Sequence, residues 1–292
     1  MIFDRIEYRT PIDKGWSGDQ KYCAVTNDGR KYLLRIAAPE RADRTKSAFF
    51  RMQQLSDLGI SMPQPLEIGI CPEGIYTIQS WIEGEDAELT IPNLSEQVQY
   101  SLGLDAGRML KIIQSLSVPA SAITWDTKFN AKIGRKITMY ESCPLRYEKD
   151  ELILNYLANN RHLLTHRPQT YQHGDYHIGN MMVDSSGKLV IIDFDRDDFG
   201  DPWEEFNRIV WCAQAAPAFA RGMVDGYFDG DVPDVFWRLL LLYICSNTLS
   251  SLPWAAPYGE TQIKVMTDQW ADIRAWFDDF MRIVPTWYRK EG

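Results

Sequence analysis

The sequence lacks several features that would place it in a particular class. Its five cysteines, at positions 23, 71, 143, 212 and 245, form no pair at the spacing of a redox or zinc motif. Its longest apolar run, at residues 239–245, is too short to span a membrane. Acidic and basic residues follow Met1 within a few positions, which is not the pattern of a signal peptide. We therefore expect reduced thiols, a cytoplasmic location and no membrane partner.

An excess of basic residues is also missing. The chain has 40 acidic and 31 basic residues, a net charge of −9, which argues against a nucleic-acid partner. Residues 193–292 carry 17 acids and 9 bases, whereas residues 1–192 carry 23 and 22. The excess acid could form a solvated surface that promotes solubility. It could also form a cleft in the second half of the chain that attracts cations.

The remaining composition is typical of a soluble globular protein, with 45% hydrophobic and 24% charged residues among 292. Periodicity predicts strands at 21–25, 31–36, 63–68 and 74–81 and a helix at 45–58. Beyond them it predicts helices at 95–115, 130–140, 148–164, 203–215, 234–249 and 261–280, and short strands at 171–172, 181–184 and 189–193. The sequence thus predicts an α+β fold that is β-rich first and helical afterwards.

The most informative segment reads His-Gly-Asp-Tyr-His-Ile-Gly-Asn at 173–180, with Ile-Ile-Asp-Phe-Asp at 191–195. It spaces the carboxylate of Asp175, the carboxamide of Asn180 and the carboxylate of Asp193 as protein kinases space a catalytic base and two magnesium ligands. Another interpretation takes His173, Asp175 and His177 as metal ligands. No second cluster of ligand residues accompanies them, so phosphoryl transfer is favoured.

The residues of these motifs resemble those of the aminoglycoside phosphotransferase family of small-molecule kinases, whose signature is His-Gly-Asp-x-His-x-x-Asn. In that family Ile-Asp-Phe and Gly-Asp-Pro follow, here at 192–194 and 200–202. The resemblance extends from about residue 15 to residue 207. It implies a two-lobed protein-kinase-like fold with ATP or GTP between the lobes. The small β-rich N-terminal lobe would be residues 1–80 and the larger α-helical lobe residues 81–292, with a hinge near 79–84.

The resemblance also implies roles for particular residues. Asp175 would be the catalytic base, and Asn180 and Asp193 would hold Mg²⁺. Arg35 stands where the family more often has a lysine that steadies the phosphates, and arginine can serve because it binds phosphate bidentately. The remaining nucleotide contacts would come from Ser17 and Gly18 in a glycine-containing loop and from Gln79, Ser80 and Ile82 at the hinge.

Two departures from the family pattern stand out. The predicted helix at 46–58 contains no glutamate to pair with Arg35, so Glu40, Asp43 or phosphate alone would have to hold it. Asp195 replaces the glycine of Asp-Phe-Gly. Outside the site, we expect Asp201 to cap a helix and His173 to orient the catalytic loop.

The acceptor is less well defined than the chemistry. The resemblance favours an aminoglycoside-type acceptor, with a choline, homoserine or sugar kinase as the alternative. The excess of acid after Asp193 predicts that the acceptor is cationic. A catalytically silent nucleotide-binding protein is a rival from another class. The sequence leaves the acceptor, the choice between ATP and GTP, and the oligomeric state open. Candidate acceptor contacts are Asp195, Asp197, Asp198, Glu204 and Glu205, which could instead cap a helix and face water.

Overall fold

The computed structural model describes residues 1–13, 18–117 and 123–288. The chain divides into two compact units. The first combines Met1–Thr90 with Asn180–Asp197, and the second combines Ile91–Gly179 with Asp198–Gly292. The sequence suggested a boundary near residue 80. The structure divides the chain ten residues later and returns the segment after Gly179 to the first unit.

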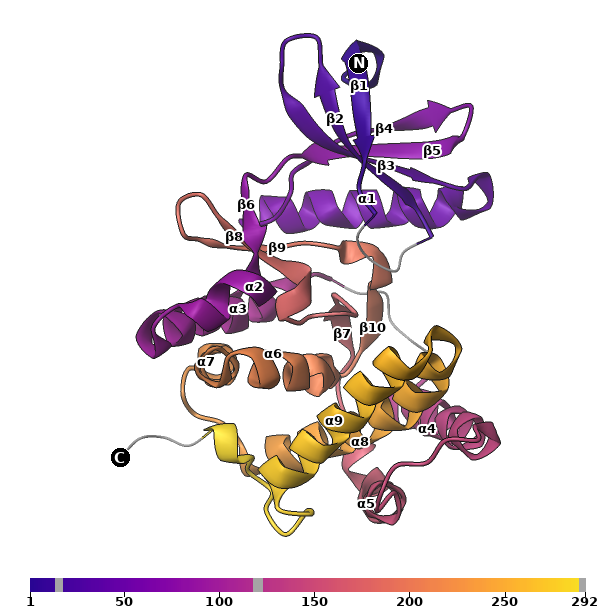
Figure 1. The fold of residues 1–292 in the computed structure, drawn as a ribbon, viewed down its shortest axis with the longest axis vertical. Helices are drawn as coiled ribbons and strands as arrows, with labels where there is room; N and C mark the ends of the chain where they lie inside the picture. Colours follow the sequence, from indigo (N-terminus) through magenta and orange to yellow (C-terminus); the bar gives the residue numbers. More distant parts are fainter. Residues whose placement is uncertain (14–17, 118–122, 289–292) are drawn as a thin grey trace. The chain divides into compact units, whose positions relative to one another are not determined.

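The first unit is built on an antiparallel sheet in the order β1-β2-β3-β5-β4 (Figure 1). Its strands are β1 (Ile6–Pro11), β2 (Gln20–Thr26), β3 (Lys31–Ala37), β4 (Pro65–Cys71) and β5 (Gly74–Ser80). Four of them match the predicted strands within three residues. The first strand was missed because it lies at the edge, where most of its side chains are exposed and show no apolar alternation.

One helix, α1 (Ala42–Asp57), packs against β4 and β5 through Phe49, Met52 and Leu55, which are buried. It begins three residues before the predicted position, directly after a 3₁₀ turn at Pro39–Arg41. A cavity of about 30 Å³ lies between this helix and the sheet, and the side chain of Arg35 borders it. The helix therefore covers one face of the sheet, next to the side chain of Arg35, the predicted phosphate-binding residue.

A small antiparallel sheet completes the first unit. It has the order β6-β8-β9 and comprises β6 (Gly84–Asp86), β8 (Met181–Asp184) and β9 (Leu189–Ile191), with the short helix α2 (Ala87–Thr90) after β6. Pairing of Glu85 with Val183 joins segments nearly a hundred residues apart. This pairing explains why residues 180–197 belong to the first unit.

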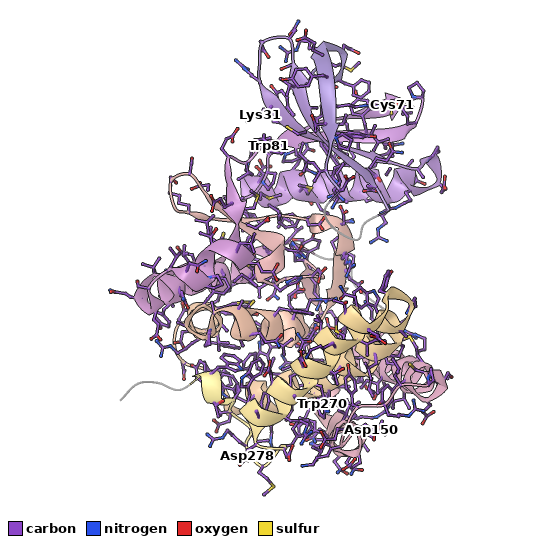
Figure 2. The ribbon with its side chains drawn as sticks, viewed as in Figure 1. Lys31, Cys71, Trp81, Asp150, Trp270 and Asp278 are labelled. Atoms are coloured by element: carbon purple, nitrogen blue, oxygen red, sulfur yellow. The ribbon has the colours of Figure 1, made fainter. Side chains whose placement is uncertain are left out.

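The second unit is mainly helical, as the sequence predicts. Its helices are α3 (Glu96–Ile113), α4 (Trp125–Ser142), α5 (Glu151–Asn160), α6 (Ile209–Ala215), α7 (Pro217–Phe228), α8 (Asp234–Ala255) and α9 (Glu260–Phe277). A two-stranded sheet pairs β7 (Thr170–Gln172) with β10 (Asp198–Gly200), and short 3₁₀ helices include η4 (Arg161–Leu164), η5 (Ile178–Asn180) and η7 (Glu204–Arg208). Trp270 of α9, labelled in Figure 2, is buried and donates to the carbonyl of Glu148 at 2.7 Å.

Helices α3 and α7 approach each other unusually closely. Each contributes a pair of glycines four residues apart, Gly103 and Gly107 on α3 and Gly222 and Gly226 on α7. A Cβ at any of these positions would lie 2.1–2.2 Å from a carbonyl oxygen of the other helix. Only glycine fits here, and the sequence analysis missed α7 altogether because glycine lowers helix propensity.

Helix α8 supplies much of the core of the second unit. By length and composition it would be long and apolar enough to cross a membrane, alone among the helices in the described part of the chain. However, 72% of its most apolar stretch is buried inside the protein, where it contacts α4, α5 and α9. Packing within the unit accounts for its apolar composition.

Candidate functional site

The hairpin of β8 and β9 brings two of the predicted metal ligands together. Met181 pairs with Ile191, and the N–H of Ile192 donates to the carbonyl of Asn180 at 3.0 Å. Asn180 and Asp193 therefore lie at the same end of the hairpin. An amide oxygen and a carboxylate are hard donors that suit Mg²⁺, which commonly takes one or two protein ligands and completes its shell with water and phosphate. These residues fit the magnesium ion that the fold implies.

Asp193 adopts the left-handed conformation, with φ 65° and ψ 61°. This conformation is uncommon outside glycine, although aspartate tolerates it better than most residues. The carboxylate is held by Arg35 at 3.1 Å and by Lys21 at 4.0 Å. Two cations thus neutralise the candidate metal ligand.

Arg35 is the centre of a cluster of carboxylates in the first unit. It lies on β3, is 6% exposed, and forms ion pairs with Asp19, Asp193 and Asp195. The expectation that Glu40 or Asp43 pairs with it is wrong. Asp195, which replaces the usual glycine, supplies one of the carboxylates that the helix lacks. Buried arginine needs such partners because an unpaired buried charge is costly.

The helix α1 contacts the segment after Asp193 with bases rather than with an acid. Arg44 donates to the carbonyl of Asp195 at 2.8 Å, and Arg51 forms an ion pair with the carboxylate of Asp197. The charges across this contact are therefore the reverse of the lysine–glutamate pair of protein kinases, in which the helix carries the acid. The family pattern predicts an acid in this helix, whereas its arginines make the contact.

The predicted nucleotide contacts are only partly visible. Ser17 lies outside the described residues, and Gly18 is exposed just before β2. The side chain of Gln79 is buried at the end of β5 and donates to the sulfur of Met52 at 3.8 Å. Ser80 exchanges hydrogen bonds with the backbone of Gln64. Ile82, the last of the predicted hinge contacts, is half-buried.

The candidate base belongs to the second unit. Asp175 follows β7 after a turn at Gly174, whose φ of 84° favours glycine. Its carboxylate lies 2.6 Å from Nε of Arg208 and 3.5 Å from Nε2 of His177. Its backbone N–H donates to Nδ1 of the fully buried His173 at 3.3 Å. His173 therefore contacts the catalytic loop, as expected, and Arg208 is a neighbour that sequence reasoning missed.

A buried glutamate anchors the same loop. Both carboxylate oxygens of Glu205 accept from the N–H of Gly174, at 2.9 and 3.2 Å. Burial, followed by the charge of Glu204, raises the pKa of Glu205 to about 8. For Glu204, burial also opposes the charged form, but the ion pair with Lys132 at 2.8 Å, together with the charges of Lys136 and Arg208, lowers the pKa. The pKa is thus raised for Glu205 and lowered for the adjacent Glu204.

The raised pKa predicts a pH-dependent stability. Because the folded protein holds the proton of Glu205 more tightly than the unfolded chain does, stability should fall as the pH rises from about 4.5 to about 8. Glu205→Gln keeps an acceptor for Gly174 and should flatten this fall in the free energy of unfolding, measured with urea across the window. The exposed Glu148→Gln serves as control. Parallel profiles for the wild type and Glu205→Gln would contradict the assignment.

Asp201 has a structural role. Its carboxylate accepts from the N–H of Trp203 at 2.9 Å and from the hydroxyl of Tyr243 at 2.6 Å, and it pairs with Arg167 at 2.5 Å. The residue is completely buried. It therefore stabilises the turn before η7 and ties β10 to α8, whereas the N-cap of η7 is Trp203 rather than the expected Asp201.

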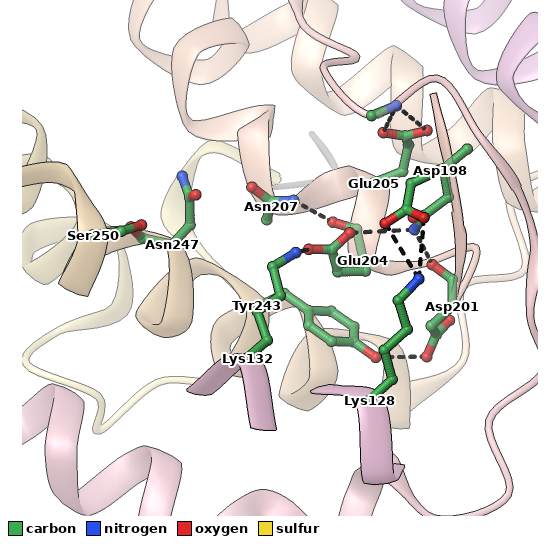
Figure 3. A network of polar contacts seen from close by, with 12 residues as sticks. Lys128, Lys132, Asp198, Asp201, Glu204, Glu205, Asn207, Tyr243, Asn247 and Ser250 are labelled. Carbon is green, nitrogen blue, oxygen red and sulfur yellow. Dashed lines mark hydrogen bonds and ion pairs between the residues drawn. The ribbon is translucent and has the colours of Figure 1, made fainter. Parts of the chain in front are cut away.

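The five acids expected to face the acceptor are all bound within the chain. Asp195 and Asp197 pair with arginines in the first unit. In the second unit, Asp198 and Glu204 pair with Lys128 and Lys132 of α4 (Figure 3). Glu205 is held by backbone. These five acids are thus held by bases or backbone groups that lie far away in the sequence.

Comparison with known proteins adds independent evidence. A solved structure with a similar fold is a thermostable mutant of an aminoglycoside phosphotransferase, with ADP and hygromycin B; it has 16% identity, covers 91% of this chain and 93% of that chain, and has a TM-score of 0.63. Another is a choline/ethanolamine kinase family protein from Mesorhizobium loti, with 15% identity, coverage of 94% and 91%, and a TM-score of 0.65.

An amicoumacin kinase bound to AMP-PNP and Ca²⁺ is also similar, with 15% identity, coverage of 96% and 90%, and a TM-score of 0.65. At such low identity these likenesses show the fold alone, a kinase-like α+β fold. No curated protein sequence matches. The model of the phosphotransferase enzyme family (APH), however, matches residues 9–236. This chain therefore belongs to the phosphotransferase enzyme family, with the fold of the small-molecule kinases.

Proposed function

We propose that the protein transfers the γ-phosphate of ATP or GTP to a hydroxyl group of a small molecule. The observation that carries the proposal is the hairpin that brings Asn180 and Asp193 together and pairs Asp193 with the buried Arg35. Asp175 precedes Asn180 by five residues in the segment that resembles the family signature. A silent binding protein would not need both a metal site and a base, so catalysis is favoured over that rival.

The chemistry assigns one task to each group. The oxygen of the acceptor hydroxyl forms a bond to the γ-phosphorus while the bond between this phosphorus and the leaving nucleoside diphosphate breaks. Asp175 accepts the proton that the hydroxyl loses. Arg208 and His177 hold the Asp175 carboxylate in place. Mg²⁺, held by Asn180 and Asp193, would neutralise charge on the phosphates. The proposed phosphate and metal ligands thus belong to the first unit, and the proposed base belongs to the second.

Arg35 provides the test of nucleotide binding. We propose that on binding its guanidinium exchanges Asp193 for phosphate, which releases the carboxylate for Mg²⁺. Arg35→Ala should weaken Mg²⁺-dependent binding of ATP and GTP by about 1.5–3 kcal/mol, the range for a hydrogen bond to a charged group. Isothermal calorimetry with and without Mg²⁺ measures this, and intrinsic hydrolysis of the nucleotide then distinguishes an enzyme from a silent binding protein.

Arg35→Lys is the matched control, since it keeps a cation on β3. It should retain most of the affinity, while circular dichroism verifies that Arg35→Ala still folds with Asp19 and Asp195 unpaired. Wild-type protein that binds neither ATP nor GTP in the presence of Mg²⁺ would overturn the proposed function. Equal affinity of the wild type and Arg35→Ala would remove Arg35 from the phosphate site.

The acceptor is proposed as a small molecule in the cytoplasm, and we propose no nucleic-acid or membrane partner. The similar structures with hygromycin B and amicoumacin support an antibiotic-type acceptor. The choline/ethanolamine kinase family protein supports a metabolic one. A strongly cationic acceptor has less support than its sequence-based expectation, because Lys128 and Lys132 already occupy Asp198 and Glu204.

A further inference from the structure

One side of helix α4 carries a row of lysines in the second unit. Lys128, Lys132 and Lys136 follow at intervals of four residues, which places them on the same side of the helix. Lys128 lies 3.1 Å from a carboxylate oxygen of Asp198, and Lys132 lies 2.8 Å from Glu204 (Figure 3). The first two lysines are therefore neutralised by acids of the chain, and Lys136 lies one turn further along.

Lys136 differs from the other two lysines. It is half-buried, and its ammonium has no hydrogen-bond or ion-pair partner within the described part of the chain. Lys132 and Arg208 repel its charge, while Glu204, already bound to Lys132, attracts it. Burial, and then the neighbouring Lys132, lower its pKa to about 7. Positive charge is thus locally in excess at a position where water compensates for it incompletely.

This excess lies in the same charged cluster as the candidate base. Arg208, which acts on Lys136, is also bound to Asp175 at 2.6 Å. It ends η7, the 3₁₀ helix that begins with Glu204. Glu204 and Arg208, whose charges act on Lys136, thus belong to one short element, and Arg208 of that element is bound to Asp175. A molecule whose hydroxyl reaches Asp175 would encounter this cluster.

We propose that the acceptor carries an anionic group, a carboxylate or a phosphate, in addition to its hydroxyl, and that Lys136 binds this group with support from Lys132 and Arg208. The inference rests on the proposed function and defines its substrate class as hydroxy acids or phosphorylated alcohols. An ammonium and an anion in a half-buried site form a charge-assisted hydrogen bond, which stabilises both groups. A polycation would instead add to the repulsion that already acts on Lys136.

The test uses four small probes that differ in charge: glycerol, ethanolamine, D-glycerate and glycerol 3-phosphate. Binding to the full chain is measured by calorimetry without nucleotide, and release of ADP from Mg–ATP is then measured with each probe. D-Glycerate or glycerol 3-phosphate should bind more tightly than glycerol and ethanolamine. Comparison of these two anions distinguishes a carboxylate from a phosphate.

Variants of α4 make the assignment specific. Lys136→Met should weaken binding of the preferred anion by about tenfold or more, as expected for loss of a charged hydrogen bond. Lys136→Arg, which keeps the cation, should restore most of the affinity. Arg135→Met is the matched control, because Arg135 is the adjacent, exposed cation on the same helix. It should change the affinity less than twofold, within about 0.4 kcal/mol.

Three results would overturn the inference. The first is that neither anion binds the wild type at up to about 10 mM, a limit weaker than typical substrate affinities. The second is that ethanolamine binds most tightly of the four probes and that Lys136→Met leaves its affinity unchanged. The third is equal loss in Lys136→Met and Arg135→Met. None of these results affects the proposed function, which fails separately if the protein shows no Mg²⁺-dependent nucleotide binding.

Discussion

Asp175→Asn should lower the turnover number by on the order of a hundredfold or more while leaving the dissociation constant for Mg–ATP nearly unchanged. The substitution keeps the size of the side chain but removes the carboxylate that accepts the proton of the hydroxyl. Nucleotide binding should persist because the proposed phosphate and metal contacts, Arg35, Asn180 and Asp193, belong to the other unit. Single-turnover phosphoryl transfer and calorimetry measure the two effects separately.

A matched control is available in the same unit. Asp105 is an exposed aspartate that pairs with Arg108 at 3.5 Å, as Asp175 pairs with Arg208. Asp105→Asn removes a comparable charge from an arginine pair far along the sequence and should leave turnover within about twofold, a change of about 0.4 kcal/mol. If Asp175→Asn transfers phosphate at the wild-type rate, Asp175 is not the base.

Asp193→Ala should abolish the Mg²⁺-dependent part of nucleotide binding, the largest expected effect on affinity. Asn180 alone would then offer one neutral oxygen to the metal, which prefers carboxylate ligands. The fold should survive because Arg35 retains Asp19 and Asp195 as partners. Calorimetric titration of ATP with and without Mg²⁺ measures the loss directly.

Two further variants separate charge from conformation. Asp193→Asn tolerates the left-handed backbone better than alanine, whose strain there costs about 1 kcal/mol. It should nevertheless lose most of the Mg²⁺ dependence. Asp28→Ala removes an aspartate that also pairs with two bases, Arg5 and Arg30, and should leave nucleotide binding unchanged. Retention of Mg²⁺-dependent binding by Asp193→Ala would show that the metal is held elsewhere.

Local patterns predicted much of the fold. The hairpin of β2 and β3, the helix α1 and the hairpin of β8 and β9 could be located because each combines a turn with an apolar period. The strand β1 and the helix α7 could not. The first has an exposed outer face, and the second contains glycines that suit a close helix contact rather than helix formation. Both β1 and α7 depend on tertiary packing, which a single sequence does not reveal.

The candidate site divides in the same way. Asp175, Asn180 and Asp193 could be proposed because their spacing is itself the signature. Asp19 and Arg208 could not, because they reach Arg35 and Asp175 through the fold rather than through sequence spacing. A count of acids along the chain also overstated the negative charge that the predicted acceptor contacts leave unpaired. Charge pairing is decided in three dimensions, whereas composition records only totals.

The glycine contact between α3 and α7 bears on how the catalytic loop keeps its shape. Tyr176, the residue after Asp175, is fully buried and donates to the carbonyl of Ala106 on α3 at 2.7 Å. Ala106 lies directly before Gly107, where α7 approaches most closely. An α7 rich in glycine gains its helical order from α3, so the two helices should form and open as one cooperative unit. The loop that carries the base is thereby anchored to a helix pair whose opening requires both members to separate.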